Sequence, residues 1–169
     1  MKRDVYFSFR TWPTLCSGLM LVLLLGGCGT APKGHPSNSA VPSRLSAEQA
    51  NDVTIYAVSL VGTPYRYGGN TPESGFDCSG LVGHIYKTRT NIVPPRTTSQ
   101  LQDWGQTVPG DQIRSGDLVL FSLGAVPNHA GIYVGSSRFV HAPSTGGEVR
   151  IDDLKSKYWS RQRVAFRRP

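Results

Sequence analysis

The hydrophobic pattern of this chain changes character once, at the two prolines at positions 94 and 95. Before them, residues 53–61 and 81–85 carry apolar side chains at the three- and four-residue spacing of helices. After them come short segments rich in β-branched and aromatic residues, separated by Gly, Ser, Asn and Pro: 118–121, 129–134, 138–141, 149–151 and 163–166. Helices followed by strands predict an α+β domain whose helices pack on an antiparallel sheet of about five to six strands.

Local signals indicate where the helices begin. Ser46 with Gln49 three residues later is a capping-box pattern, so a first helix is expected to start at residue 47. Asp77 is a favourable N-cap, so a second helix is expected to start at Cys78. One of the threonines at 97–98 is expected to cap a short third helix.

The first 28 residues resemble the export signal of a bacterial lipoprotein. Three basic residues among the first ten precede an apolar run at 15–25, and Leu25-Gly26-Gly27-Cys28 closes the run with small residues before a cysteine. The resemblance implies cleavage before Cys28 and attachment of lipid to that cysteine. A transmembrane helix is the alternative, but the strongly apolar run has only 11 residues, whereas about 20 are needed to span a bilayer.

The same segment predicts the compartment and the domain boundaries. Residue 29 is glycine rather than aspartate, which by resemblance to sorted lipoproteins favours a lipid anchor on the periplasmic face of the outer membrane. We therefore expect a signal peptide at 1–27, the lipidated cysteine with a flexible tether at 28–45, and one domain at 46–169. The tether contains several prolines and almost no large apolar residues.

The chain is basic, but the charge defines no partner by itself. Removing the leader lowers the formal net charge from +7 to +5, and six of the remaining basic residues lie between Lys155 and Arg168 with no acid among them. Such a stretch suits an anionic lipid or wall polymer, and it is equally compatible with a solvated surface. Nucleic acid is not an expected partner of an exported protein, and a monomer is favoured.

Cys78 has the properties of a nucleophile. Of the three cysteines, Cys16 and Cys28 belong to the leader and the lipid signal, so Cys78 has no disulfide partner in an exported domain. A cysteine at a helix start lies near unpaired backbone donors and the positive end of the helix dipole. We therefore expect a stabilised thiolate, and the same donors could bind an oxyanion.

Cysteine catalysis also requires a base, and the chain has four histidines. His35 lies in the tether, and His84 is six residues beyond the cysteine, roughly 240° round the helix, so it points elsewhere and is expected to be a packing or surface residue. His129 and His141 lie on adjacent predicted strands joined by a turn at 135–137.

The two strand histidines share a face only if the strands pair irregularly. A plain two-residue Ser136–Ser137 loop would pair Ile132 with His141 and turn His129 to the opposite face, because side chains alternate along a strand. We therefore predict an odd-length loop or a β-bulge between residues 129 and 141.

The same residues have other common uses in proteins. A lone cysteine is often a small buried apolar residue, and a strand histidine is often a satisfied polar group. One cysteine and two histidines could also hold a catalytic zinc ion, but the chain lacks the close ligand pair of structural zinc sites. The helix-start position of the unpaired thiol favours catalysis without a metal or an organic cofactor.

Five segments in order resemble the NlpC family of papain-like cell-wall peptidases, and the resemblance covers about residues 50–169. The segments are Tyr65-Arg66-Tyr67-Gly68-Gly69, Gly75-Phe76-Asp77-Cys78-Ser79-Gly80-Leu81-Val82, Gly116-Asp117-Leu118-Val119-Leu120-Phe121, Asn128-His129-Ala130-Gly131-Ile132-Tyr133-Val134-Gly135 and Phe139-Val140-His141-Ala142. The resemblance implies a papain-like fold.

The resemblance also implies roles for individual residues. Cys78 would be the nucleophile, His129 the general base and later the acid, and His141 the third polar residue that orients His129. Tyr65 is similar to the family tyrosine that assists the oxyanion hole. Asp77 and Ser79, on either side of the cysteine, match substrate-contacting positions of the family.

The implied reaction is hydrolysis of an amide in peptidoglycan stem peptides during wall remodelling. The D-alanine to diaminopimelate cross-link is favoured as the bond, and the D-glutamyl to diamino acid bond within the stem is the alternative. Two further classes stay open. One is a lipid acyltransferase, because related domains with the same Cys and His order transfer acyl groups, and the other is a catalytically inactive wall-binding module.

Overall fold

The computed structural model describes residues 41–122, 124–144 and 146–169. The predicted signal peptide, the lipidated Cys28 and most of the tether, with His35, lie outside the described residues. Among the helices of the described ranges, none is long and apolar enough to cross a membrane.

Two helices of 13 residues each begin where the sequence predicted. Helix α1 (Ala47–Ser59) starts with the predicted capping box: the Gln49 N–H donates to the Ser46 hydroxyl, and the Ser46 N–H donates to the Gln49 side chain. Helix α2 (Cys78–Thr90) has Asp77 as its N-cap and ends at Asn91 in the left-handed conformation. Both starts follow from contacts within four residues, which is why the sequence alone located them.

Two shorter helices lie outside this pair. Helix α3 (Thr98–Leu101) is capped by Thr97, whose hydroxyl accepts the N–H of Gln100, so the predicted third helix is confirmed. A single 3-10 turn, η1 (Trp159–Arg161), precedes the last strand and had no periodic signal in the sequence.

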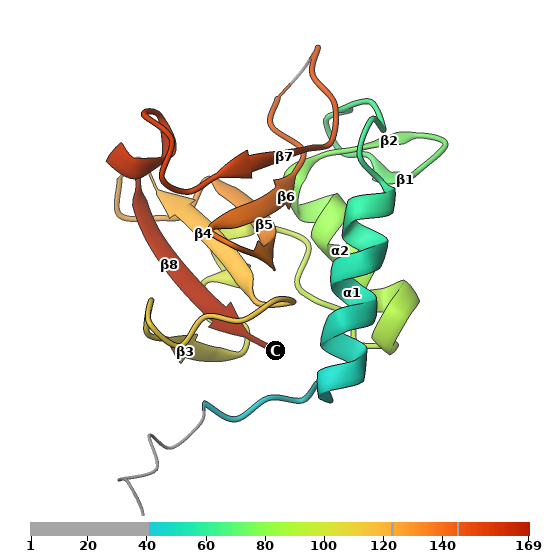
Figure 1. Cartoon of the computed structure of the whole chain (residues 1–169). Coiled ribbons are helices and arrows are strands. Elements are labelled where there is room, and N and C mark those ends of the chain that lie inside the picture. The colour runs from blue at the N-terminus through green and yellow to red at the C-terminus, as the bar shows by residue number, and fades with distance from the viewer. Residues whose placement is uncertain (1–40, 123, 145) are drawn as a thin grey trace, which may run out of the picture. The chain divides into compact units, whose positions relative to one another are not determined.

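A six-stranded antiparallel sheet forms the second layer, in the spatial order β3-β8-β4-β5-β6-β7 (Figure 1). Its strands are β3 (Gln106–Val108), β4 (Leu118–Ser122), β5 (His129–Gly135), β6 (Arg138–His141), β7 (Arg150–Asp153) and β8 (Arg163–Arg168). A separate two-stranded piece is formed by β1 (Asn70–Thr71) and β2 (Gly75–Phe76). The predicted α+β architecture is therefore confirmed.

The sequence missed the shortest strands and misplaced the end of another. Strands β1, β2 and β3 have two or three residues each, too few to show an alternating pattern. Strand β7 begins at Arg150 and extends to Asp153, whereas 149–151 was predicted. The extension matters for function, because it places Asp152 in the sheet beside β6.

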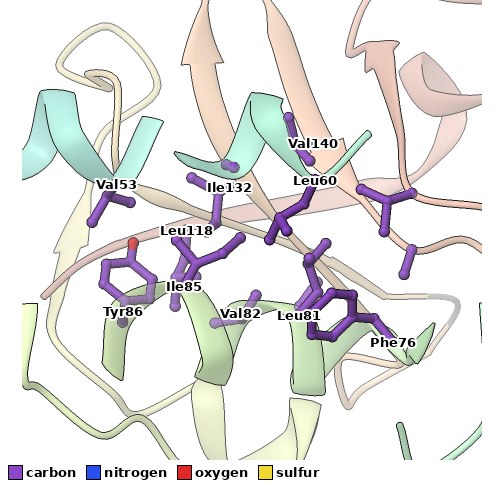
Figure 2. Packing of buried hydrophobic residues seen from close by; sticks show 14 of the residues in the cluster. Val53, Leu60, Phe76, Leu81, Val82, Ile85, Tyr86, Leu118, Ile132 and Val140 are labelled. Atoms are coloured by element: carbon purple, nitrogen blue, oxygen red, sulfur yellow. The ribbon is translucent and has the colours of Figure 1, made fainter. Parts of the chain in front are cut away.

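The main core lies between the helices and one face of the sheet. Figure 2 shows Leu81, Val82 and Ile85 of α2 packed together with buried side chains of α1 and of strands β4, β5 and β6. The opposite face carries a smaller aromatic cluster, which consists of Val119, Phe121, Phe139 and Trp159. Strand β5 therefore has one face under α2 and the other under the segment that contains η1.

The basic C-terminal stretch is partly structural. Arg168 is only 4% exposed and forms two hydrogen bonds with the Asp117 carboxylate, at 2.9 and 2.8 Å. Truncating either partner would leave a buried charge unpaired, so this pair secures the end of β8. Arg168 is therefore not part of any anion-binding surface.

Candidate active site

Cys78 is partly exposed at the first position of α2, and Asp77 organises the turn before it. One Asp77 oxygen accepts the Gly80 N–H at 2.6 Å and the other accepts the Gly68 N–H at 2.9 Å. Gly80 is required here, because a Cβ at this position would lie 2.0 Å from the backbone oxygen of Gly69. One carboxylate thus ties the glycine turn to the helix start that carries the thiol.

Arg96 belongs to the same cluster, although no sequence motif pointed to it. It donates to both Asp77 oxygens, at 2.9 and 2.8 Å, and to the Ser79 hydroxyl at 2.7 Å. Burial by itself would raise the pKa of Asp77, but the hydrogen bonds from Arg96 and Gly80 outweigh it and lower that pKa. Asp77 and Ser79 are both buried, and both take part in this hydrogen-bonded cluster.

The predicted bulge between the two strand histidines is present. Gly135 pairs with Arg138 across the Ser136–Ser137 turn, but Tyr133 pairs with Phe139, so one extra residue stands on β5. Ser136 and Ser137 have φ of 51° and 60°, as a two-residue type I′ hairpin turn requires. The shift puts His129 and His141 on the same face of the sheet, and their rings meet.

His129, His141 and Asp152 form a hydrogen-bonded chain. The distance from His129 Nε2 to His141 Nδ1 is 2.8 Å, and that from His141 Nε2 to Asp152 Oδ2 is 3.0 Å. An ionised carboxylate can only accept, so His141 carries its proton on Nε2 and its Nδ1 is an acceptor. His129 must then donate from Nε2, which leaves His129 Nδ1 as the free basic nitrogen.

Asp152 is held in place by two further donors. Trp159 Nε1 donates to Asp152 Oδ2 at 2.8 Å, and Arg150 donates to the same oxygen from Nε at 3.2 Å and from Nη2 at 3.0 Å. These bonds and His141 lower the pKa of Asp152 although burial opposes them. The Trp159 ring also stacks on His129, with 5.6 Å between ring centroids. Neither Asp152 nor Trp159 was predicted as a site residue.

Both histidines are neutral at pH 7. Burial lowers the pKa of His129 to about 3. The positive charge that His141 gains in acid and the charge of Arg150 lower this pKa further, whereas the charge of Asp152 opposes them. Burial likewise lowers the pKa of His141 to about 4, although Asp152 opposes the change. The tautomers deduced from Asp152 therefore describe the resting site.

The expectation of a lowered thiol pKa is wrong. Burial raises the pKa of Cys78, and the charge of Asp77 adds to the rise. Backbone N–H groups of Ala130, Ser79 and Cys78 itself oppose it, but they do not outweigh burial. The helix-start donors are present as expected; packing against β5 supplies the larger effect, which no local pattern reveals.

Tyr65 lies beside the thiol, and His84 does not belong to the site. The Tyr65 N–H donates to the Gly147 oxygen at 2.8 Å, which ties its segment to the β6–β7 loop. Burial raises the pKa of Tyr65, and the negative charges of Cys78 and Asp77 add to the rise, as their proximity requires. His84 instead bonds the Tyr56 hydroxyl at 2.9 Å and packs on aromatic rings, as predicted.

The described residues provide no cluster of three or more His, Cys, Asp or Glu side chains placed to hold a metal ion. Hydrogen bonds already occupy His129 Nε2 and both ring nitrogens of His141. What the site offers chemically is a thiol, a free imidazole nitrogen and backbone donors at a helix start. On an α+β fold with helices against an antiparallel sheet, that arrangement defines a papain-like cysteine peptidase.

Comparison with known proteins identifies the family. Residues 62–168 match the NlpC/P60 family model, and the chain belongs to this family. The murein DD-endopeptidase MepS/murein LD-carboxypeptidase of Escherichia coli is 32% identical over 168 residues, covering 89% of this chain and 88% of that protein. The probable endopeptidase NlpC of E. coli is 35% identical over 148 residues, covering 86% and 93%.

Other relatives share only the domain. The murein DD-endopeptidase MepH of E. coli is 40% identical over 112 residues, and the match spans 64% of this chain but 41% of MepH. Among solved structures, the NlpC/P60 domain of the peptidoglycan hydrolase SagA has a TM-score of 0.61 and 28% identity, and covers 69% of this chain and 96% of that domain. The predicted fold class and family are thus confirmed.

Proposed function

We propose that this chain is a cysteine endopeptidase of the bacterial envelope that hydrolyses the D-alanine to diaminopimelate cross-link of peptidoglycan. The observation that carries the proposal is the His129–His141–Asp152 chain, together with a partly exposed Cys78 thiol that lies against the backbone N–H of Ala130, the residue after His129. The likeness to MepS, which is named as a murein DD-endopeptidase and matches over most of both chains, supports the choice of substrate.

In the proposed mechanism, Cys78 and His129 start as neutral groups. The Cys78 Sγ attacks the carbonyl carbon of the scissile amide while His129 Nδ1 takes the thiol proton. The backbone N–H of Cys78 and the hydroxyl of Tyr65 stabilise the oxyanion. His129 then gives its proton to the leaving amine, and the C–N bond breaks to leave a thioester on Cys78.

The second half of the reaction regenerates the enzyme. Water attacks the thioester while His129 Nδ1 accepts its proton, and that proton returns to the Cys78 sulfur as the peptide acid leaves. His141 keeps the His129 ring oriented throughout, and the Asp152 charge stabilises the imidazolium that forms at each transfer. Asp152 acts through His141 and is a positioning residue.

The bond within the stem peptide is the second candidate. The γ-DL-glutamyl hydrolase of Bacillus subtilis is 38% identical over 130 residues, but the match covers 31% of that protein. The cross-link is favoured because the match to MepS extends over nearly the full length of both chains. A lipid acyltransferase or an inactive wall-binding module would cut neither bond.

We also propose that the chain is lipidated at Cys28 and acts from the periplasmic face of the outer membrane. The lipobox-like sequence Leu25-Gly26-Gly27-Cys28 and Gly29 support this location. Metabolic labelling with a palmitate analogue should mark the wild type and not Cys28→Ser. Equal labelling of both proteins would contradict the anchor.

The substrate is tested with purified muropeptides. The full-length protein in detergent is incubated with cross-linked dimers and with uncross-linked tetrapeptides, and products are identified by mass spectrometry. We expect monomers from the dimers, intact tetrapeptides, and no activity from Cys78→Ala. Cleavage of the tetrapeptide between glutamate and diaminopimelate would select the second candidate, and cleavage of neither would reject both.

A further inference from the structure

A cavity opens on one side of the catalytic histidine. It has a volume of about 330 Å³, and its lining includes His129, Arg150, Tyr158, Trp159, Asn128 and Gln162. The three residues at the helix start and oxyanion side, Cys78, Ser79 and Tyr65, do not line it. The cavity therefore borders the general acid rather than the nucleophile.

The position beside His129 determines which part of the substrate enters this cavity. In amide hydrolysis by a cysteine, the acyl portion becomes bonded to sulfur, and the amine portion receives its proton from the histidine. The leaving amine must therefore lie within hydrogen-bond distance of the His129 ring. The cavity along that ring accordingly receives the residue that bears the leaving amine.

Arg150 is the charged side chain of the cavity, and the Nη1 end of its guanidinium is free to bind a ligand. Its Nε and Nη2 are engaged with Asp152 Oδ2, which holds the guanidinium in one orientation. Among the residues that the structure describes, Nη1 has no hydrogen-bond acceptor, and the side chain is 52% exposed. Among the described residues that line the cavity, none has an acidic side chain. Arg150 can therefore bind an anion of the substrate without breaking its own support.

The two candidate bonds differ at this point of the substrate. In the cross-link, the carbon that bears the leaving nitrogen is the D-centre of diaminopimelate, which also carries a free carboxylate. In the glutamyl to diaminopimelate bond of a stem that continues to D-alanine, the corresponding carbon carries an amide carbonyl. A cation in the leaving-group cavity thus favours the cross-link.

We infer that Arg150 binds the carboxylate adjacent to the leaving amine and thereby selects the cross-link over the bond within the stem. The inference rests on the proposed function and assigns a specificity-determining residue to the same site. The aromatic walls from Tyr158 and Trp159 complete the cavity for the aliphatic chain of the diamino acid.

The inference is tested with two cross-linked dimers that differ in one group. In one dimer the carboxyl next to the leaving amine is free, and in the other it is amidated. Amidation removes the charge of the acceptor and with it about half of the strength of the hydrogen bond, so we expect a preference of roughly 3- to 10-fold in kcat/KM for the free acid. This comparison uses the wild-type protein and requires no variant to fold.

Arg150→Met should abolish the preference. Loss of Arg150 also removes two hydrogen bonds to Asp152. That effect acts equally on both dimers, so the ratio of their kcat/KM values is the readout. We expect a ratio near one for Arg150→Met and an intermediate ratio for Arg150→Lys. Arg138→Met, on the exposed start of β6, is the matched control and should keep the wild-type ratio.

Two results would overturn the inference and leave the proposed function standing. Wild-type protein could cut both dimers equally well, or Arg150→Met could keep the full preference. If wild-type protein cut neither dimer, the proposed function itself would fail.

Discussion

At the scale of single residues, Asp152 decides where the protons of the site lie. Because it can only accept, the proton positions on His141 and His129 follow in sequence, and the free nitrogen of His129 is Nδ1. Asp152 was not apparent from the sequence, since it is one of two consecutive aspartates in a polar segment. Its role emerges only from its distance to His141.

Asp152→Asn tests this role. The amide oxygen can still accept the bonds of His141 and Trp159, but the negative charge that stabilises the His129 imidazolium is lost. We expect kcat to fall by about 10- to 100-fold with little change in KM, as expected for a charge several ångströms from the forming imidazolium. Steady-state kinetics on a cross-linked dimer measure both parameters.

Asp153→Asn is the matched control for this variant. Asp153 is exposed on the same strand and accepts the N–H of Lys155, away from the histidines. It should keep the wild-type kcat. A purely structural role of Asp152 would be indicated if Asp152→Asn lost stability but kept kcat.

At the scale of elements, the β5–β6 hairpin assembles the histidine pair. The bulge after Tyr133 sets the register, and Gly131 lets β6 approach β5 closely opposite His141. A Cβ at Gly131 would lie 2.7 Å from the Val140 oxygen and 3.2 Å from the His141 Cβ. The hairpin therefore tolerates no side chain at this position without a shift of β6.

Gly131→Ala should separate the two histidines. Moving β6 to admit the methyl group is expected to cost about 1–3 kcal/mol of unfolding free energy and to reduce kcat more than 10-fold, since a small displacement of a catalytic group has a large effect. Denaturant titration and kinetics measure the two effects.

Gly83→Ala is the corresponding control. Gly83 lies in the middle of α2, and a Cβ there would have no neighbour within 4 Å. Alanine should stabilise the helix by about 0.5–1 kcal/mol and leave kcat unchanged. Wild-type kinetics of Gly131→Ala would show that the close approach of the strands is unnecessary.

At the scale of the whole molecule, the site draws on both sides of the sheet: Cys78 begins a helix of the helix layer, and His141 packs against Phe139 and Trp159 on the opposite face. Burying His141 there makes the folded protein less stable in acid. His141 is 0% exposed, and burial lowers its pKa to about 4. The unfolded chain takes up a proton on this histidine below about pH 6.5, whereas the folded chain does so only near its lower pKa. The contribution of His141 to the free energy of unfolding is therefore complete above pH 6.5 and declines as the pH falls toward 4.

His141→Asn should reduce this acid sensitivity. Between pH 7 and pH 5 the wild type should lose roughly 2 kcal/mol more unfolding free energy than the variant, from the proton uptake of one histidine in the unfolded state. Urea titrations of both proteins at the two pH values measure the difference. Equal losses in the two proteins would show that His141 is not held neutral by the fold.

The predictable part of the molecule rests on local interactions. The caps at Ser46 and Asp77 involve contacts within four residues, and the helix-then-strand pattern follows from side-chain spacing. The bulge was predictable too, because two histidines required to share one face of the sheet leave few registers. The face is the one covered by Trp159 and not the one under α2, which the sequence did not predict. Short strands such as β3 escaped prediction because two or three residues carry no period.

By itself, the sequence determined the α+β class, the family and the helix starts, and it predicted Cys78, His129 and His141 as the site residues. Only the tertiary structure decided that Asp152, Arg150 and Trp159 join them, and that burial raises the thiol pKa instead of lowering it. The physical reason is range: capping and periodicity act between neighbours in the chain. Desolvation and the hydrogen bonds of a buried carboxylate depend on segments that meet only after the sheet has formed.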